Sequence, residues 1–207
     1  MKTIKLLAIG AFTALFAACS GGEKKDSNLA EEAVKSVVTE AQTVVIDQEA
    51  SKVMWEGTMI GIYSHEGTLN FNSGMYTVEN GKLTSGKFEV DMTSMKATDE
   101  NYNPEEGKTP EKLIGHLSSD DFFAVNEHPT ASFEVTRVQD GKVYGNLTIR
   151  GNTHEEELSE VSVAENGAVK ASLTFDRTKY DVNFDHPAQD MVLSDEIEIK
   201  VALKPAI

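Results

Sequence analysis

The stretch from residue 116 to residue 135 reads HLSSDDFFAVNEHPTASFEV, and its interpretation decides the fold assigned to the whole chain. It combines two histidines, two adjacent serines and two adjacent aspartates with a pair of phenylalanines. These residue types occur in hydrolase active sites, but they also occur where a short helix ends and a strand begins. The sequence on either side separates the two interpretations.

A short helix is predicted over residues 109–118, overlapping the start of this stretch. Thr109 is a suitable N-cap, Pro110 fits the first helical position, and Glu111 puts an acidic side chain in the first turn. The apolar side of the helix is supplied by Leu113, Ile114 and Leu117. The serines and aspartates then end the helix, the phenylalanine pair provides apolar anchors, and the His-Pro pair precedes the strand ASFEV.

The hydrolase alternative needs a nucleophile, a base and an orienting acid that meet in space. The candidates are Ser118 or Ser119, His116 or His128, and Asp120 or Asp121. Neither serine lies in a strand-to-helix elbow such as GxSxG, and residues so close in sequence seldom adopt the geometry of a triad. We therefore expect no catalytic residue and keep a serine/histidine hydrolase as the least favoured alternative.

From about Thr43 to Ile207 the chain alternates apolar and polar residues with a period of two, which predicts β-strands. In KFEVDM, for example, Phe88, Val90 and Met92 face one way and the three charged residues face the other. Further apolar faces are formed by Val53 and Trp55; Leu69 and Phe71; Val143, Leu147 and Ile149; Val169, Leu173 and Phe175; and Ile197, Ile199, Val201 and Leu203. The length of this region is that of a single domain, and its class is all-β.

Three dipeptides lie between alternating segments and indicate tight turns: Asn80-Gly81, Asp140-Gly141 and Asn166-Gly167. Such pairs suit type I′ turns, in which both central residues have positive φ, so three antiparallel hairpins are predicted. The apolar face of the sheet must be covered by a second sheet or by closure of the sheet on itself. A closed barrel of about eight strands leaves room for one small or elongated ligand, whereas a sandwich does not. Periodicity alone does not distinguish the two.

The first residues, MKTIKLLAIGAFTALFAACS, are typical of a bacterial lipoprotein signal peptide over residues 1–18. Lys2 and Lys5 form a basic start, an apolar run follows, and small residues precede Cys19, the only cysteine of the chain. We expect acylation of Cys19 and a partly disordered or weakly helical tether over residues 19–41. A soluble signal peptide cleaved nearby is the alternative. Acylation predicts a protein of the bacterial cell envelope, anchored to a membrane and facing the periplasm or the cell surface.

The chain is strongly acidic, which bears on its partners. It carries 19 basic and 34 acidic side chains, a formal charge of -15. Removing residues 1–18 takes away two lysines and no acid, so the mature chain has 17 minus 34, or -17. Such a surface repels phosphate backbones, and we expect no nucleic-acid partner.

No metal site is expected. The histidines are scattered and form no HxxxH pair: His65, His116, His128, His154 and His186. Residues 181–192, DVNFDHPAQDMV, begin like a calcium loop, but histidine stands where glycine is required and valine where glutamate is required. We expect no other cofactor.

Six segments follow one another in the order SKVMWEG, LIGHLSSDDFF, HPTASFEV, GNLTIRGNT, FDRTKYDVNF and LSDEIEIKVAL, and together extend over essentially all of residues 42–207. Taken in this order, they resemble the YceI-like family of lipid-binding proteins. The matching positions are Ser51, Val53, Trp55, Gly57, Leu113, His116, Leu117, Asp121, Phe122, Phe123, Pro129, Phe133, Gly145, Leu147, Ile149, Gly151, Thr153 and Arg177. The chain departs from the family pattern at His128, where tyrosine is usual, and at Ala124, where an acid is usual.

The resemblance implies a closed, lipocalin-like antiparallel β-barrel whose long apolar cavity holds a polyisoprenoid or similar long-chain lipid. It brings no catalytic residues with it. We expect the cavity to be lined by Trp55, Phe71, Phe88, Phe122, Phe123, Phe133, Leu147 and Phe175, with Gly145 and Ala171 leaving room for the ligand. The candidates for contact with a polar headgroup are Arg177, His128 and His65.

The predicted function is therefore non-enzymatic binding, storage or transport of a long-chain isoprenoid or fatty lipid in the envelope. The main alternative is a surface module with a filled β core that binds protein or glycan. The partners expected are the lipid and the membrane to which Cys19 is attached. The sequence leaves the oligomeric state open, including a homodimer.

Overall fold

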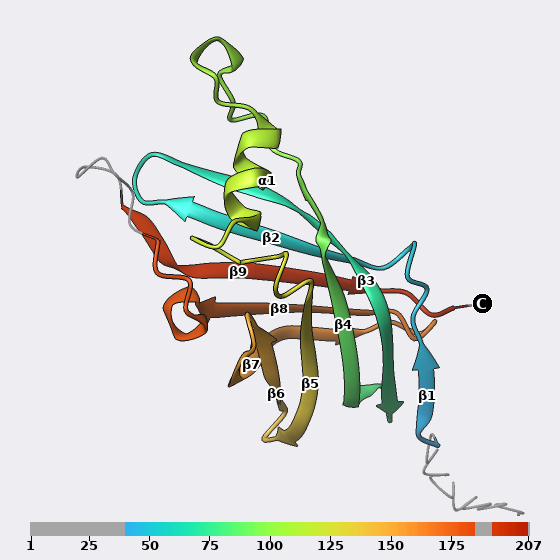
Figure 1. The fold of residues 1–207 in the computed structure, drawn as a ribbon. Coiled ribbons are helices and arrows are strands. Elements are labelled where there is room, and N and C mark those ends of the chain that lie inside the picture. Colours follow the sequence, from blue (N-terminus) through green and yellow to red (C-terminus); the bar gives the residue numbers. More distant parts are fainter. Residues whose placement is uncertain (1–39, 185–191, 207) are drawn as a thin grey trace, which may run out of the picture. The chain divides into compact units, whose positions relative to one another are not determined.

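The computed structural model describes residues 40–184 and 192–206 (Figure 1). The predicted signal peptide 1–18, the acylation site Cys19 and all but the last two residues of the tether 19–41 lie outside the described residues. His186 and most of the segment tested as a calcium loop also lie outside them.

The domain consists almost entirely of β-strands. These are β1 (Gln42–Val45), β2 (Lys52–Met59), β3 (Tyr63–Glu79), β4 (Lys82–Ala97), β5 (Thr130–Gln139), β6 (Lys142–Ile149), β7 (Asn152–Val163), β8 (Val169–Asp176) and β9 (Leu193–Leu203). The short helical elements are η1 (Pro104–Glu106), α1 (Pro110–Ser118) and η2 (Arg177–Tyr180). Within the described residues no helix is both long and apolar enough to cross a lipid bilayer.

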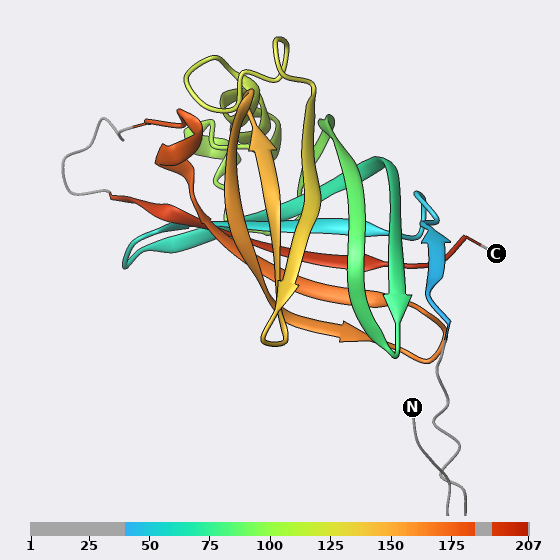
Figure 2. The same cartoon turned by 90° about the horizontal axis from the view of Figure 1, so that it is seen from below.

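The strands β2 to β9 form a closed antiparallel barrel. Their order is β3-β2-β9-β8-β7-β6-β5-β4, and β4 pairs back onto β3. The long strand β3 pairs with β2 along its first half and with β1 along its second half, so β1 prolongs the wall beyond β2. The orthogonal views in Figures 1 and 2 show the strands curving round to meet. The predicted closed barrel of about eight strands is confirmed, and the sandwich alternative is wrong.

Most apolar residues of the strands face the barrel interior. Along β8, for example, Val169, Ala171, Leu173 and Phe175 are buried and Thr174 between them is exposed. The apolar faces predicted from the period of two are all part of the buried core or packed against it. The alternation of apolar and polar residues therefore reflects a barrel wall with one face toward solvent and the other toward the apolar interior.

The predicted helix over residues 109–118 is confirmed as α1. The side chain of its N-cap, Thr109, accepts a hydrogen bond of 3.4 Å from the backbone N–H of Lys112. The chain then folds back on the helix, where the N–H of Phe123 donates to the carbonyl oxygen of Leu117 at 3.0 Å. Residues 116–135 therefore form a helix end and a connection into β5, as their spacing indicates.

The predicted hairpins are present, but one of their turns differs in type. Asn80-Gly81 and Asp140-Gly141 have positive φ at both residues, as type I′ turns require. Between β7 and β8 the loop covers residues 164–168, and of the pair Asn166-Gly167 only the glycine has positive φ, at 82°. The type I′ prediction was wrong there because the longer loop closes on a bond from the N–H of Gly167 to the Ala164 oxygen.

A further tight turn was not predicted. Arg150 and Gly151 connect β6 to β7 with φ values of 50° and 75°. Arginine seldom occupies a left-handed position, so the sequence carries no turn signal. The Arg150 side chain is held there by bonds from Nη1 to the carbonyl oxygens of Phe122 and Asp181, at 2.6 and 2.8 Å.

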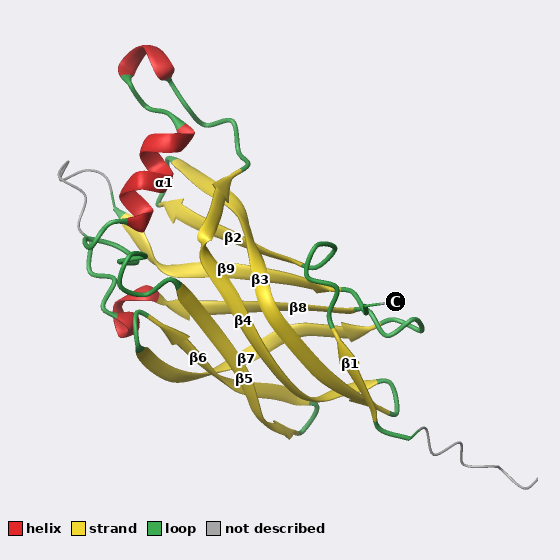
Figure 3. Cartoon of the chain, turned by 45° about the vertical axis from the view of Figure 1, so that its right-hand side comes forward, coloured by secondary structure: helices red, strands yellow, loops and turns green. Residues whose placement is uncertain are grey.

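The two ends of the barrel differ. One end carries α1, η2 and the β2–β3 and β6–β7 turns, and we call it the helical end (Figure 3). At the opposite end the Tyr76 hydroxyl donates to the Gly167 oxygen at 2.6 Å, across a plug of side chains that are almost fully buried. The plug consists of Tyr76, Leu83, Val169 and Leu203.

Candidate functional site

The barrel encloses an apolar cavity of about 500 Å³. Every barrel strand contributes to its wall, and α1 and the loop after it contribute from the helical end. Small-molecule sites usually measure ~300–1,000 Å³. The filled-core alternative required side chains to fill the whole interior, and this cavity contradicts it.

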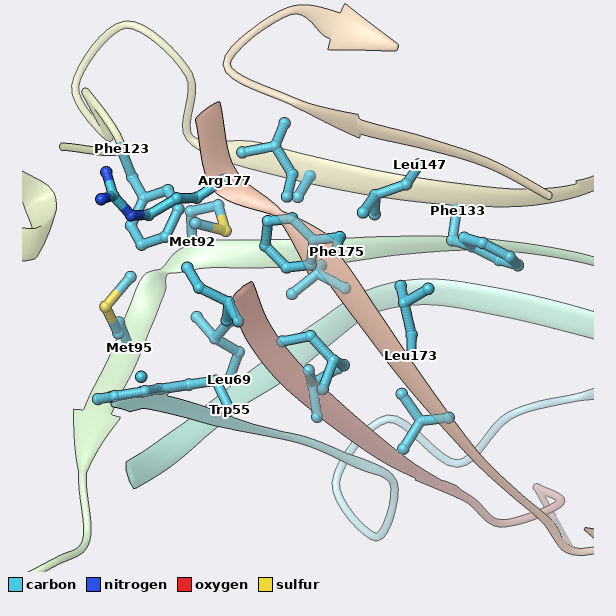
Figure 4. Close-up of a pocket in the computed structure, with 18 of the residues that line it drawn as sticks. Trp55, Leu69, Met92, Met95, Phe123, Phe133, Leu147, Leu173, Phe175 and Arg177 are labelled. Atoms are coloured by element: carbon cyan, nitrogen blue, oxygen red, sulfur yellow. The ribbon is translucent and has the colours of Figure 1, made fainter. Parts of the chain in front are cut away.

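All eight residues predicted to line the cavity do so. Trp55, Phe71, Phe88, Phe122, Phe123, Phe133, Leu147 and Phe175 lie in its wall, and several of them are seen in Figure 4. Prediction from aromatic residues missed the methionines of the wall, Met59, Met92 and Met95. Methionine is flexible and fills irregular space, so it suits a wall that must adapt to a long ligand. The period of two in β4 already placed Met92 on the apolar face.

The two small residues expected to leave room behave differently. Ala171 lies in the cavity wall, as expected. Gly145 does not, because the Phe133 ring lies directly over its Cα and occupies the position that a Cβ would take. The prediction for Gly145 was wrong, and the glycine instead provides a seat for an aromatic ring of the neighbouring strand.

At the helical end the cavity reaches the surface beside a cluster of polar and aromatic side chains. Tyr63 and His65 of β3 line the cavity there, with 37% of Tyr63 and 19% of the His65 side chain exposed. The His65 ring stacks on Tyr102, with 5.2 Å between centroids, and meets Tyr63 edge to face at 5.0 Å. Its Nδ1 lies 3.0 Å from Oδ1 of Asp99.

Asp99 holds this cluster together. Burial alone would raise its pKa, but bonds from the Asn101 N–H, the His65 ring, the Glu66 N–H and the Tyr102 hydroxyl outweigh burial and lower it. Burial and the bond to Asp99 raise the pKa of Tyr102. An ionised carboxylate accepts bonds only, so Nδ1 of His65 carries the hydrogen. Asp99 thereby fixes the orientation of the imidazole at the opening.

Arg177, a predicted headgroup contact, lines the cavity but is already engaged. It is only 4% exposed, and each of its three nitrogens donates one bond. Nε binds the Ser194 oxygen at 3.0 Å, Nη1 the Val182 oxygen at 2.6 Å and Nη2 the Asp195 carboxylate at 2.9 Å. Arg177 therefore ties η2 to the start of β9, and its charge is compensated within the protein.

The other two headgroup candidates lie in different places. His65 is in the cavity wall at the helical end. His128 is absent from the wall and lies against Gly151 in the β6–β7 turn, with its Cε1 3.5 Å from the position of a Cβ on that glycine.

Two nitrogen atoms among the cavity-lining residues have no hydrogen-bond partner in the described part of the chain. They are Nε1 of Trp55 and Nε2 of His116, and both atoms are buried. A buried polar atom without a partner costs ~1–3 kcal/mol. His116 packs edge to face on Phe184, with 4.5 Å between centroids, and on Phe122 at 5.7 Å. No pattern in the sequence singles out the N–H of Trp55 or the ring nitrogen of His116.

The residues of the hydrolase alternative are not arranged as a triad. The Ser119 hydroxyl donates to the backbone oxygen of His116 at 2.7 Å and caps the helix end. Within residues 40–184 and 192–206, no hydrogen bond joins Ser118 or Ser119 to a histidine ring. In the same residues, no three acidic, histidine or cysteine side chains gather as they would around a metal ion.

Comparison with known proteins agrees with this architecture. The model of the YceI-like domain matches residues 45–204. A UPF0312 protein of Staphylococcus epidermidis is 33% identical over 106 residues, which are 45% of this chain and 60% of the relative. A UPF0312 protein of Staphylococcus aureus is 37% identical over 81 residues, covering 33% and 46% of the two chains. The chain thus spans about half the length of these curated relatives.

A solved structure shares the fold. BcnA of Burkholderia cenocepacia superposes with a TM-score of 0.62 at 22% identity, over 76% of this chain and 98% of that one. A polyisoprenoid-binding domain from Saccharophagus degradans, implicated in plant cell wall breakdown, gives a TM-score of 0.47 at 11% identity, over 79% and 97%. The match to BcnA indicates a shared barrel.

Proposed function

Because the chain belongs to the YceI-like family, we propose that it binds a long-chain isoprenoid or similar lipid inside the barrel without catalysing a reaction. The observation that carries this proposal is the apolar cavity of about 500 Å³, walled by every strand of the barrel. It reaches the surface at the helical end and is plugged at the other, so an elongated ligand enters with one end leading.

Apolar contact is sufficient to retain such a ligand. At ~25 cal/mol per Å² of apolar area, burying several isoprene units is favourable by on the order of 10 kcal/mol before ordering costs. The wall needs no charged group to achieve this. Selection among lipids then depends on the length and width of the cavity.

We further propose that the lipid carries no net charge. Among the described residues, the wall contains no aspartate, glutamate or lysine, and its one arginine is paired with Asp195. A phosphate or carboxylate drawn into this space would lack a free cation, and burying an uncompensated charge is costly. The bound lipid is therefore an alcohol, ether, ketone or hydrocarbon.

The unpartnered nitrogens of Trp55 and His116 are the proposed contacts for a polar atom of the ligand. The indole N–H is a donor only, and it would pair with a hydroxyl, ether or carbonyl oxygen. Nδ1 of His65 faces Asp99, so Nε2 is the ring nitrogen left for a ligand at the opening. A neutral headgroup fits polar atoms of this kind.

The proposed setting is the bacterial envelope, where acylated Cys19 would keep the barrel at a membrane. The signal-like residues 1–18 and the absence of any second cysteine support it. Storage or transport of a membrane lipid is the corresponding role.

Extraction of the purified protein with organic solvent, followed by mass spectrometry, tests the proposal. We expect a long-chain neutral lipid in the extract, and we expect added polyprenol to bind more tightly than the matching polyprenyl phosphate. A lipid-free extract from protein that also fails to bind polyprenol would refute lipid binding. Preferential binding of the phosphate would refute the neutral headgroup alone.

A further inference from the structure

The β2–β3 turn exposes apolar side chains at the helical end of the barrel. Ile60 is 57% exposed, Ile62 53% and Tyr63 37%, and Val192, 56% exposed, is joined to them by the bond from the Ile60 N–H to its oxygen at 2.8 Å. We call these four residues the apolar rim. Figures 1 and 3 show the turn at the same end as α1.

The apolar rim continues the wall of the cavity to the outside. Tyr63 belongs to both, and Met59 and Leu193 of the wall are the sequence neighbours of Ile60 and Val192. Residues 57–64, GTMIGIYS, carry no charged side chain, although 26% of the chain is charged. Contiguous exposed apolar residues next to an apolar cavity mark a surface that is covered during function.

We propose that the apolar rim inserts into the surface of a lipid bilayer, so that the ligand passes between the membrane and the cavity without crossing water. This docking surface presupposes the lipid-binding function proposed above. Aliphatic side chains beside a tyrosine suit the boundary between headgroups and acyl chains, where an aromatic ring with a polar end is favoured. Because the mature chain has a net charge of -17, the membrane it fits is one with zwitterionic headgroups.

The position of the expected anchor is compatible with this contact. Residues 20–41, that is 22 residues, separate Cys19 from β1, which begins at the plugged half of the barrel. A chain of that length spans at most ~75 Å. The longest strand, β3, has 17 residues and extends over ~56 Å. An anchor at Cys19 therefore leaves the helical end able to meet the same membrane.

The test compares two pairs of exposed apolar residues in the full-length, acylated protein. The double variant I60S/I62S makes the two isoleucines of the rim polar. The matched control V45S/M75S alters two cross-strand partners on β1 and β3, 56% and 51% exposed, away from the cavity. Uptake of polyprenol from phosphatidylcholine vesicles and binding of polyprenol from detergent micelles are measured for each.

We expect I60S/I62S to slow uptake from vesicles at least about tenfold, since two isoleucines no longer enter the bilayer, while binding from micelles is unchanged. V45S/M75S should match the unmodified protein in both measurements. Equal uptake by all three proteins overturns the docking surface while leaving lipid binding intact. Failure of every protein to bind polyprenol from micelles sinks the proposed function instead.

Membrane contact is also measured without any ligand. Tryptophan introduced as I60W should be quenched by vesicles with brominated acyl chains, whereas V45W should not. Equal quenching at both positions, or none at position 60, overturns the proposal. The proposal is also overturned if the rim joins two copies of the chain. Light scattering would then show a dimer that the I60S/I62S variant converts to a monomer.

Discussion

At the scale of single residues, one part of the cavity wall is shaped by a glycine and a tryptophan. The Trp55 ring lies against Gly67, its partner on the adjacent strand, and the Lys96 oxygen also lies where a Cβ on that glycine would be. A glycine beneath an aromatic ring is a known device in sheets, because the ring covers a backbone that has no side chain of its own. The Phe133 ring packs on Gly145 in the same way elsewhere in the barrel wall.

The variant G67A is expected to lower the free energy of unfolding by about 1–3 kcal/mol, because its methyl group would overlap both the indole and the Lys96 carbonyl. Gly57 is the control, since nothing lies within 4 Å of a Cβ placed there. G57A should leave stability unchanged or raise it by up to ~1 kcal/mol. Guanidinium unfolding followed by circular dichroism measures both. Equal losses for the two would show that packing under Trp55 is not the cause.

At the scale of elements, the sequence correctly predicted those helices and turns that are specified by residues close together in the chain. The helix over 109–118 and the type I′ turns at Asn80 and Asp140 are specified by caps and by residues that tolerate positive φ. The Arg150-Gly151 turn escaped prediction because contacts with distant carbonyl groups hold the arginine in place. The pairing of His65 with Asp99 escaped for the same reason, since 34 residues separate them.

The loop after β4 is held to β3 through Asp99, and this attachment should depend on pH. The folded protein keeps the pKa of Asp99 below its ordinary value of 3.8, so ionisation is favoured by folding. The resulting stabilisation is complete above that value and is lost as the pH falls through the folded-state pKa. D99N should therefore cost about 1–3 kcal/mol at pH 7, where it leaves N–H groups without acceptors. Its deficit should shrink below pH 3.8.

Urea unfolding of the unmodified protein and D99N between pH 7 and pH 2 measures this difference. Asp120 is exposed and provides the control, because D120N should change stability by less than ~0.5 kcal/mol at pH 7. A deficit of D99N that stays constant down to pH 2 would show that shape, not charge, makes Asp99 important.

At the scale of the whole molecule, closure was the feature that the residue pattern left open. Period-two alternation is the same in a sandwich and in a barrel, and only the pairing of β3 with β4 completes the ring. The resemblance to the YceI-like family predicted a closed barrel, but no single residue specifies that its interior is empty. The aromatic residues of the wall fill part of the space, and the remaining 500 Å³ depends on how all the strands curve.

The empty interior leads to a prediction that separates function from folding. Leu173 of β8 points into the cavity, and its neighbour Thr174 faces solvent on the same strand. L173W should place a larger ring in space that is vacant, so the free energy of unfolding should change by less than the ~1–3 kcal/mol typical of overpacked cores. Polyprenol binding should nevertheless fall, because the ring and the lipid need the same volume. T174W adds an identical ring outside the barrel and should bind polyprenol normally. Binding isotherms and guanidinium unfolding distinguish the outcomes. If L173W binds polyprenol as well as T174W does, the lipid does not occupy the cavity. A large loss of stability in L173W would mean that the space around Leu173 is already filled.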